Sequence, residues 1–213
     1  MEKMKKIVLL ALTLIAASCA GSQLKEAVEE PLRTGDLIFV GIPADYHSDG
    51  MADAIAEIDT LGQPWVIDAT LAYGVDRHPL DTFFAQFRLE GERQATFILK
   101  RLDRPQDELD AFVEKAKSFC GEAYDQSFRP DNGRHYCTEL VRDSYRPADG
   151  SYLFSEYPMN WKDADGEFPA YWVWLFDLLG EPIPQDEPGT NPQQMSAEPI
   201  LRDAGFLVPA MQD

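Results

Sequence analysis

The sequence predicts one mixed α+β domain, in which a small sheet or barrel packs with a few helices. Its 213 residues suffice for one domain with a core and are few for two. With 45% hydrophobic and 11% aromatic residues, the chain is too apolar to be disordered. Short apolar runs alternate with segments whose apolar residues recur every three or four positions, as strands and helices require.

Strands are predicted where short apolar runs lie next to turn residues. The run 36–41, Asp-Leu-Ile-Phe-Val-Gly, follows the turn pair Thr34-Gly35 and has the length of a buried strand. We expect further strands at 65–69, 74–77 and 96–102.

Helices are predicted at 79–87, 107–119 and 138–145. In each of them, apolar residues gather on one face. The aromatic-rich segment 170–179 is followed by Gly180, and repeated prolines from Glu181 onward predict an extended arm.

The charge balance excludes one class of partner. The chain has 37 acidic and 19 basic residues, for a net charge of −18. A nucleic-acid backbone requires a basic face, which this composition does not supply, so we expect no nucleic-acid binding. The acidity by itself indicates a solvated surface and names no substrate.

The N-terminus has the pattern of a secretory signal. Three lysines within 1–6 precede the apolar run 7–17, and Ala16-Ala17-Ser18 precede Cys19. A cysteine directly after small residues resembles a bacterial lipobox, in which acyl groups are attached to that cysteine. We therefore expect residues 1–18 to be a lipoprotein signal peptide, with an ordinary signal peptide cut near Ala20 as the alternative.

This interpretation divides the chain into three parts. A signal peptide at 1–18 precedes a polar tether at 19–31, and the domain with its proline-rich C-terminal extension occupies 32–213. It predicts a protein of the bacterial cell envelope, periplasmic or surface-exposed, that is attached to the membrane through a lipidated Cys19.

Two cysteines then remain in the domain, Cys120 and Cys137. In an oxidising compartment they can form a disulfide, or one of them can be a free nucleophile. Cys137 stands at the predicted start of a helix, where backbone amides and the helix dipole favour a thiolate and can stabilise an oxyanion. A small buried side chain that merely begins a helix is the simpler alternative.

Five short motifs occur in a fixed order along the chain: Gly-Asp-Leu-Ile-Phe at 35–39, Val-Ile-Asp-Ala at 66–69, Gly-Val at 74–75, Gly-Glu-Ala-Tyr-Asp at 121–125 and Tyr-Cys-Thr-Glu-Leu at 136–140. This series resembles the YiiX/YebB-type cysteine hydrolases, a circularly permuted, papain-like branch of the NlpC-type amidases. The resemblance runs from about 32 to 145, and the rest resembles extensions of Bacteroides-type lipoproteins.

The resemblance implies a fold, a chemistry and residue roles. It implies a permuted papain-like fold, with Cys137 as the nucleophile that forms a thioester from an amide or ester. Asp68 is implied as the polar residue that orients a catalytic histidine. Cell-wall peptides or acyl-lipid bonds are the implied substrates, and no cofactor or metal is implied.

The expected histidine is absent from its place. Only 23 residues, 42–64, lie between the first two predicted strands, where relatives fit a helix and the histidine-bearing strand. Here 51–56 resembles the helix and 57–59 the end of that strand, so the strand itself is expected to be missing. The position of the base falls near Ala52 or Asp53, and neither residue exchanges protons at neutral pH as imidazole does.

Three histidines remain as substitutes. His47 is nearest in sequence and is the candidate base, whereas His78 is expected at the surface and His135 beside the pocket. Two functions stay open: a cysteine hydrolase of the cell envelope, and an inactive relative that binds peptide, glycan or lipid in the old cleft. The lack of the histidine leaves the activity of the hydrolase in question.

Overall fold

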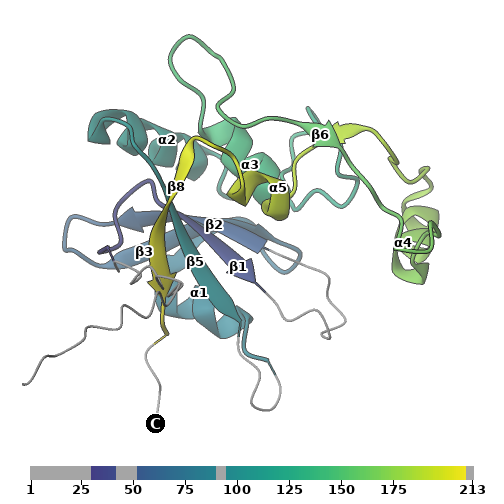
Figure 1. Cartoon of the computed structure of the whole chain (residues 1–213), viewed down its shortest axis with the longest axis horizontal. Helices are drawn as coiled ribbons and strands as arrows, with labels where there is room; N and C mark the ends of the chain where they lie inside the picture. The colour runs from purple at the N-terminus through teal and green to yellow at the C-terminus, as the bar shows by residue number, and fades with distance from the viewer. Residues whose placement is uncertain (1–29, 42–51, 90–94, 210–213) are drawn as a thin grey trace, which may run out of the picture.

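The computed structural model describes residues 30–41, 52–89 and 95–209. A six-stranded antiparallel sheet lies at its centre, in the order β4-β3-β2-β1-β5-β8 (Figure 1). The strands are β1 (Leu37–Gly41), β2 (Ala52–Ile58), β3 (Pro64–Thr70), β4 (Gly74–Pro79), β5 (Thr96–Leu102) and β8 (Leu201–Leu207). The predicted α+β class is confirmed.

Helices cover both faces of the sheet because its strands are apolar on both sides. Helix α1 (Leu80–Gln86) packs on one face, with Ile38 and Val40 beneath it. Helices α2 (Gln106–Ser118) and α3 (Cys137–Ser144) pack on the other, over Leu37 and Phe39. Alternate residues of β1 thus enter two separate cores, as the period of a strand requires.

The segment between α3 and β8 extends away from the sheet. It contains β6 (Tyr157–Pro158), α4 (Ala170–Leu179), β7 (Pro188–Gly189) and α5 (Pro192–Ser196). Helix α4 lies at the far end of this extension, at the right of Figure 1. Within the described residues, no helix is both long and apolar enough to cross a membrane.

The prediction of an extended arm after Glu181 is wrong for its second half. Asn191 caps the short helix α5 by accepting a hydrogen bond from the Gln194 amide, and Pro192 suits its first position. Strand β8 then pairs with β5 and buries Leu201 and Ala204. Residues 201–207 form a strand because they pair with β5, which is far from them in the sequence.

The prediction that residues 51–56 resemble a helix, and that a strand is missing there, is also wrong. Residues 52–58 form β2, an inner strand of the sheet. Its central Ile55 lies opposite Leu37 of β1 and Ile67 of β3. A strand therefore occupies the segment where none was expected from the sequence, and residues 52–58 contain no histidine.

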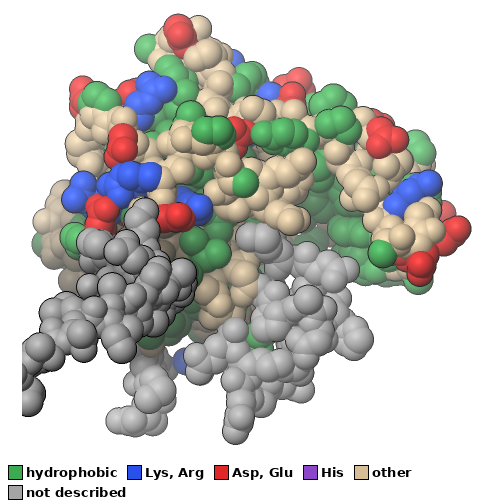
Figure 2. Space-filling view, in the orientation of Figure 1, with side chains coloured by type: hydrophobic (Ala, Val, Ile, Leu, Met, Phe, Trp, Pro, Cys, Tyr) green, Lys and Arg blue, Asp and Glu red, His purple; other side chains and the backbone are tan. Residues whose placement is uncertain are grey.

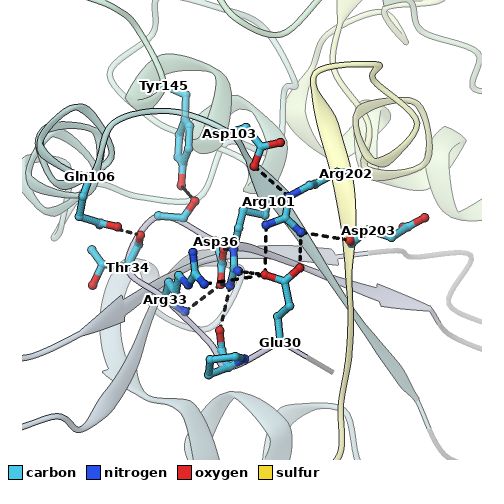
Figure 3. A network of polar contacts seen from close by, with 12 residues as sticks. Glu30, Arg33, Thr34, Asp36, Arg101, Asp103, Gln106, Tyr145, Arg202 and Asp203 are labelled. Atoms are coloured by element: carbon cyan, nitrogen blue, oxygen red, sulfur yellow. Dashed lines mark hydrogen bonds and ion pairs between the residues drawn. The ribbon is translucent and has the colours of Figure 1, made fainter. Parts of the chain in front are cut away.

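A buried arginine fixes the beginning of the domain to the sheet (Figure 3). Arg101 of β5 donates to both carboxylate oxygens of Asp36, each at 2.6 Å, and also contacts Glu30. Beside this network, the Tyr145 hydroxyl at the end of α3 donates to the Gly35 carbonyl at 3.0 Å. The carboxyl end of α3 is thereby fixed to the turn before β1.

Candidate active site

Cys137 is the first residue of α3, as its sequence context predicts, and its side chain is partly exposed. The backbone amide of Tyr136, just before it, donates to the Glu139 carboxylate at 3.4 Å. The Tyr136 hydroxyl accepts from the Thr190 amide at 3.0 Å, and Thr190 also bonds the Thr138 hydroxyl at 2.9 Å. The extension after α3 therefore holds the start of the helix in place.

Asp53 of β2 stands opposite Cys137. It shares the side of β2 with Ile55, which belongs to the core under α2 and α3, and it is 1% exposed. Neither of its oxygens makes a hydrogen bond of normal geometry within the described residues. Among side chains, the Cys137 thiol affects its pKa most, and the Asp68 carboxylate contributes less. A carboxylate buried without partners is costly, which makes it a candidate functional group.

Burial shifts the acid strength of both groups. It raises the pKa of Asp53 from 3.8 to about 7, although contact with the Cys137 thiol opposes the rise. Burial also raises the pKa of the Cys137 thiol well above 9, and the neighbouring Asp53 charge raises it further. At neutral pH the pair therefore holds a thiol next to a half-ionised carboxyl group, unlike the thiolate–imidazolium pair of a cysteine–histidine site.

The prediction from the sequence that Asp53 cannot serve as a base assumes the acid strength of an ordinary aspartate. An exposed aspartate cannot exchange protons at neutral pH, whereas buried Asp53 has a pKa in the range of imidazole. The signal was present in the sequence, because Asp53 is an acidic residue among the apolar residues of 52–56.

Asp68, expected to orient the base, faces the other side of the sheet. It follows the alternation of Val66, which packs in the core under α1, while Ile67 and Ala69 point toward α2 and α3. Its carboxylate contacts Nε2 of His78 at 2.9 Å. Asp68 therefore contacts the imidazole of His78 and not a base at Cys137. His78 is buried, contrary to the expectation of a surface residue.

Of the other two histidines, the structure describes His135. His47 lies outside the described residues. His135 has its Nδ1 2.8 Å from the Glu122 carboxylate and its Nε2 3.5 Å from Asp143. With both ring nitrogens facing carboxylates, His135 is not directed at the sulfur of Cys137.

Two further features of this region are the state of the second cysteine and the groups that could bind a metal ion. Cys120 and Cys137 are both free thiols, and Cys120 is exposed. Among the described residues there is no group of three histidine, cysteine or acidic side chains that could hold a metal ion.

A cysteine at the beginning of a helix, facing a sheet strand that precedes it in sequence, defines a papain-like thiol site in permuted order. Residues 31–203 match the family described as permuted papain-like amidase enzyme, YaeF/YiiX, C92 family. The chain belongs to this family, which confirms the resemblance and extends it beyond residue 145.

Among solved structures, the chain is similar to the crystal structure of the metalloprotein yiiX from Escherichia coli O157:H7. The two share 24% sequence identity and a TM-score of 0.63, over 83% of this chain and 98% of that chain. This likeness shows the permuted papain-like fold. No curated protein matches the sequence.

Proposed function

We propose that this protein is a thiol-dependent hydrolase of the bacterial cell envelope, in which Asp53 replaces the family histidine as the base. Membership of the amidase family supports the reaction class. The observation that carries the proposal is the buried Asp53 carboxyl group, which faces Cys137 and has a pKa of about 7. A base acts best when its pKa is close to the working pH.

The pair can perform the proton transfers of amide or ester cleavage. As Sγ of Cys137 attacks the carbonyl carbon, the Asp53 carboxylate accepts the thiol proton, and backbone amides at the start of α3 stabilise the oxyanion. Protonated Asp53 then donates that proton to the leaving nitrogen or oxygen, which leaves a thioester on Cys137. Asp53 next accepts a proton from water, which cleaves the thioester and restores the thiol.

The location and substrates belong to the same proposal. The lysines, apolar run and Cys19 at the N-terminus support secretion and attachment to a membrane through acyl groups. Cell-wall peptides or acyl amides and esters are then the substrates within reach. Radiolabelled palmitate is expected to label the chain but not its Cys19→Ala variant, and equal labelling of the two would contradict the anchor.

One observation favours a second function. Burial raises the pKa of the Cys137 thiol and the neighbouring Asp53 raises it further, so this thiol is a poor nucleophile until its proton is taken. An inactive protein that binds peptide, glycan or lipid in the same cleft is the alternative. It predicts ligand-induced stabilisation that survives Cys137→Ala.

Thiol labelling separates the two functions. In a Cys120→Ser background, a substrate-like electrophile is expected to label Cys137, and neither Cys137→Ala nor Asp53→Asn is expected to react appreciably. If the parent reacts no better than Cys137→Ala, the hydrolase proposal fails. In that case, strong labelling of Asp53→His would show that the cleft is intact and that only the base is inadequate.

A further inference from the structure

Helix α4 exposes an apolar face to solvent. Its exposed large side chains are Tyr171, Val173, Trp174 and Leu178, and between 41% and 68% of each is accessible. The rings of Tyr171 and Trp174 lie side by side, with centroids 6.1 Å apart. We call these four residues the α4 face. Several exposed apolar side chains on one short helix at the end of the extension indicate an interaction site.

Packed aromatic rings connect the α4 face to the candidate active site. Tyr171 packs on Trp172 at 4.9 Å, and Trp172 packs on Phe128 at 5.8 Å. Phe128 in turn lies 5.2 Å from the ring of Tyr136, the residue before Cys137. This series anchors α4 beside the start of the nucleophile helix.

Tyr124 shows that the two sites adjoin. Burial raises its pKa, and smaller contributions come from Cys137 and from Tyr171. Both groups therefore lie within electrostatic range of one phenol. Tyr124 also packs on Phe128, with ring centroids 6.3 Å apart, and so belongs to the same series of rings.

The surroundings of the α4 face are acidic. Residues 157–187 contain seven acidic side chains and one basic one, Lys162, whose ammonium lies over the ring of Phe168 at 5.2 Å. Arg129, from outside this segment, pairs with Glu181 and Glu187, and an acidic excess remains. On the visible side of this region, at the right of Figure 2, acidic side chains lie beside hydrophobic ones. Such a surface attracts cations and repels anionic lipid.

We propose that the α4 face binds an apolar side chain of a positively charged peptide, whose amide is presented to Cys137. The charge selects against an anionic membrane, and aromatic residues flanked by aliphatic ones suit the side chains of a peptide. The acidic surroundings would not contribute charge attraction to the binding of a neutral sugar. The orientation toward Cys137 rests on the proposed function, whereas the binding itself does not require catalysis.

Calorimetric titration of the full chain carrying Cys137→Ala tests the binding without turnover. The probes are acetyl-Gly-X-Lys-Gly amides, in which X is Phe, Leu or Ala, and acetyl-Gly-Phe-Glu-Gly amide. We expect the Phe and Leu peptides with lysine to bind at millimolar concentration or below, and the other two to bind at least about tenfold more weakly. The Trp174→Ala substitution should weaken binding of the Phe and Leu peptides with lysine about tenfold. Leu61→Ala, at an 83% exposed residue of the β2–β3 turn, should change nothing.

Three results would overturn the inference: no binding of the Phe and Leu peptides at millimolar concentration, equal binding by Trp174→Ala, or equal binding of the Lys and Glu peptides. Binding of phosphatidylcholine vesicles or chitotetraose, lost in Trp174→Ala while the peptides fail, would assign the face to lipid or glycan instead. If the peptides bind but the parent chain never cleaves an amide, the inference stands and the proposed hydrolase fails. If the parent chain and its Trp174→Ala variant cleave an amide equally well, the proposed hydrolase stands and the inference about the α4 face fails.

Discussion

Replacing Asp53 with asparagine is expected to alter the stability of the protein more favourably at alkaline pH than at acid pH. The substitution keeps the shape of the side chain and removes its ionisation. In the unfolded chain Asp53 loses its proton near pH 3.8, whereas in the fold it holds the proton up to about pH 7. Between these values the folded protein binds more protons, so its stability decreases as pH rises.

The size of the effect follows from the two pKa values. Each pKa unit corresponds to about 1.4 kcal/mol, so the rise from 3.8 to about 7 makes ionised Asp53 cost roughly 4 kcal/mol inside the fold. The buried amide of Asp53→Asn also lacks partners, which costs about 1–3 kcal/mol at every pH. That constant cancels when the gain at pH 8 is compared with the gain at pH 4, which leaves a difference of about 4 kcal/mol.

Urea unfolding monitored by tryptophan fluorescence at a series of pH values measures this difference. Asp165→Asn is the matched control, because it makes the same chemical change at an exposed residue, where substitutions alter stability little. If the free energy of unfolding gained by Asp53→Asn is the same at pH 4 and pH 8, within about 1 kcal/mol, Asp53 does not ionise as a buried carboxyl group and the reasoning about the base fails.

Two further predictions concern the two faces of the sheet. Asp53→His is expected to lower the pKa of the Cys137 thiol, because an imidazolium stabilises a thiolate. In a Cys120→Ser background, the rate of alkylation by iodoacetamide at neutral pH, measured by mass spectrometry, should rise at least about tenfold. An unchanged rate would show that residue 53 does not interact with the sulfur of Cys137. His78→Ala leaves buried Asp68 without its partner and should cost about 3 kcal/mol in urea unfolding. Burial opposes charging of His78, but the Asp68 contact raises its pKa overall, so the loss should be largest below pH 6.5 and shrink as pH rises; a loss independent of pH would contradict an ionic pair.

Local sequence signals predicted most of the fold and the nucleophile. The strand at 96–102 and the helices flanking it have periodic apolar residues with glycine or proline at their ends, so their bounds were predicted to within one residue. Cys137 was placed at a helix start for the same reason. Such features are determined by residues close together in the chain.

Features that depend on pairing between distant strands escaped prediction. The segment 52–58 has the small and acidic residues of a helix, yet β1 and β3 on either side supply hydrogen-bond partners that make it a strand. Asp68 shows the same limit at finer scale. Its motif placed it on the right strand, but a step of one residue decides which face a side chain takes, and that step put Asp68 under α1.

In the proposed mechanism a buried carboxyl group replaces imidazole as the base, which keeps the pKa near 7 but makes each protonation state one unit more negative. A cysteine–histidine pair that is ready to react carries no net charge, whereas the Cys137–Asp53 pair carries one negative charge in its reactive form. Neutral, protonated Asp53 therefore does not stabilise a thiolate by its charge before the attack. Proton transfer to Asp53 must then accompany formation of the bond between the sulfur and the carbonyl carbon. A negative site also favours substrates with a positive group near the scissile bond. The acidic region around α4 has the same preference, so one charge selection would serve both the chemistry at Cys137 and the binding of the peptide beside it.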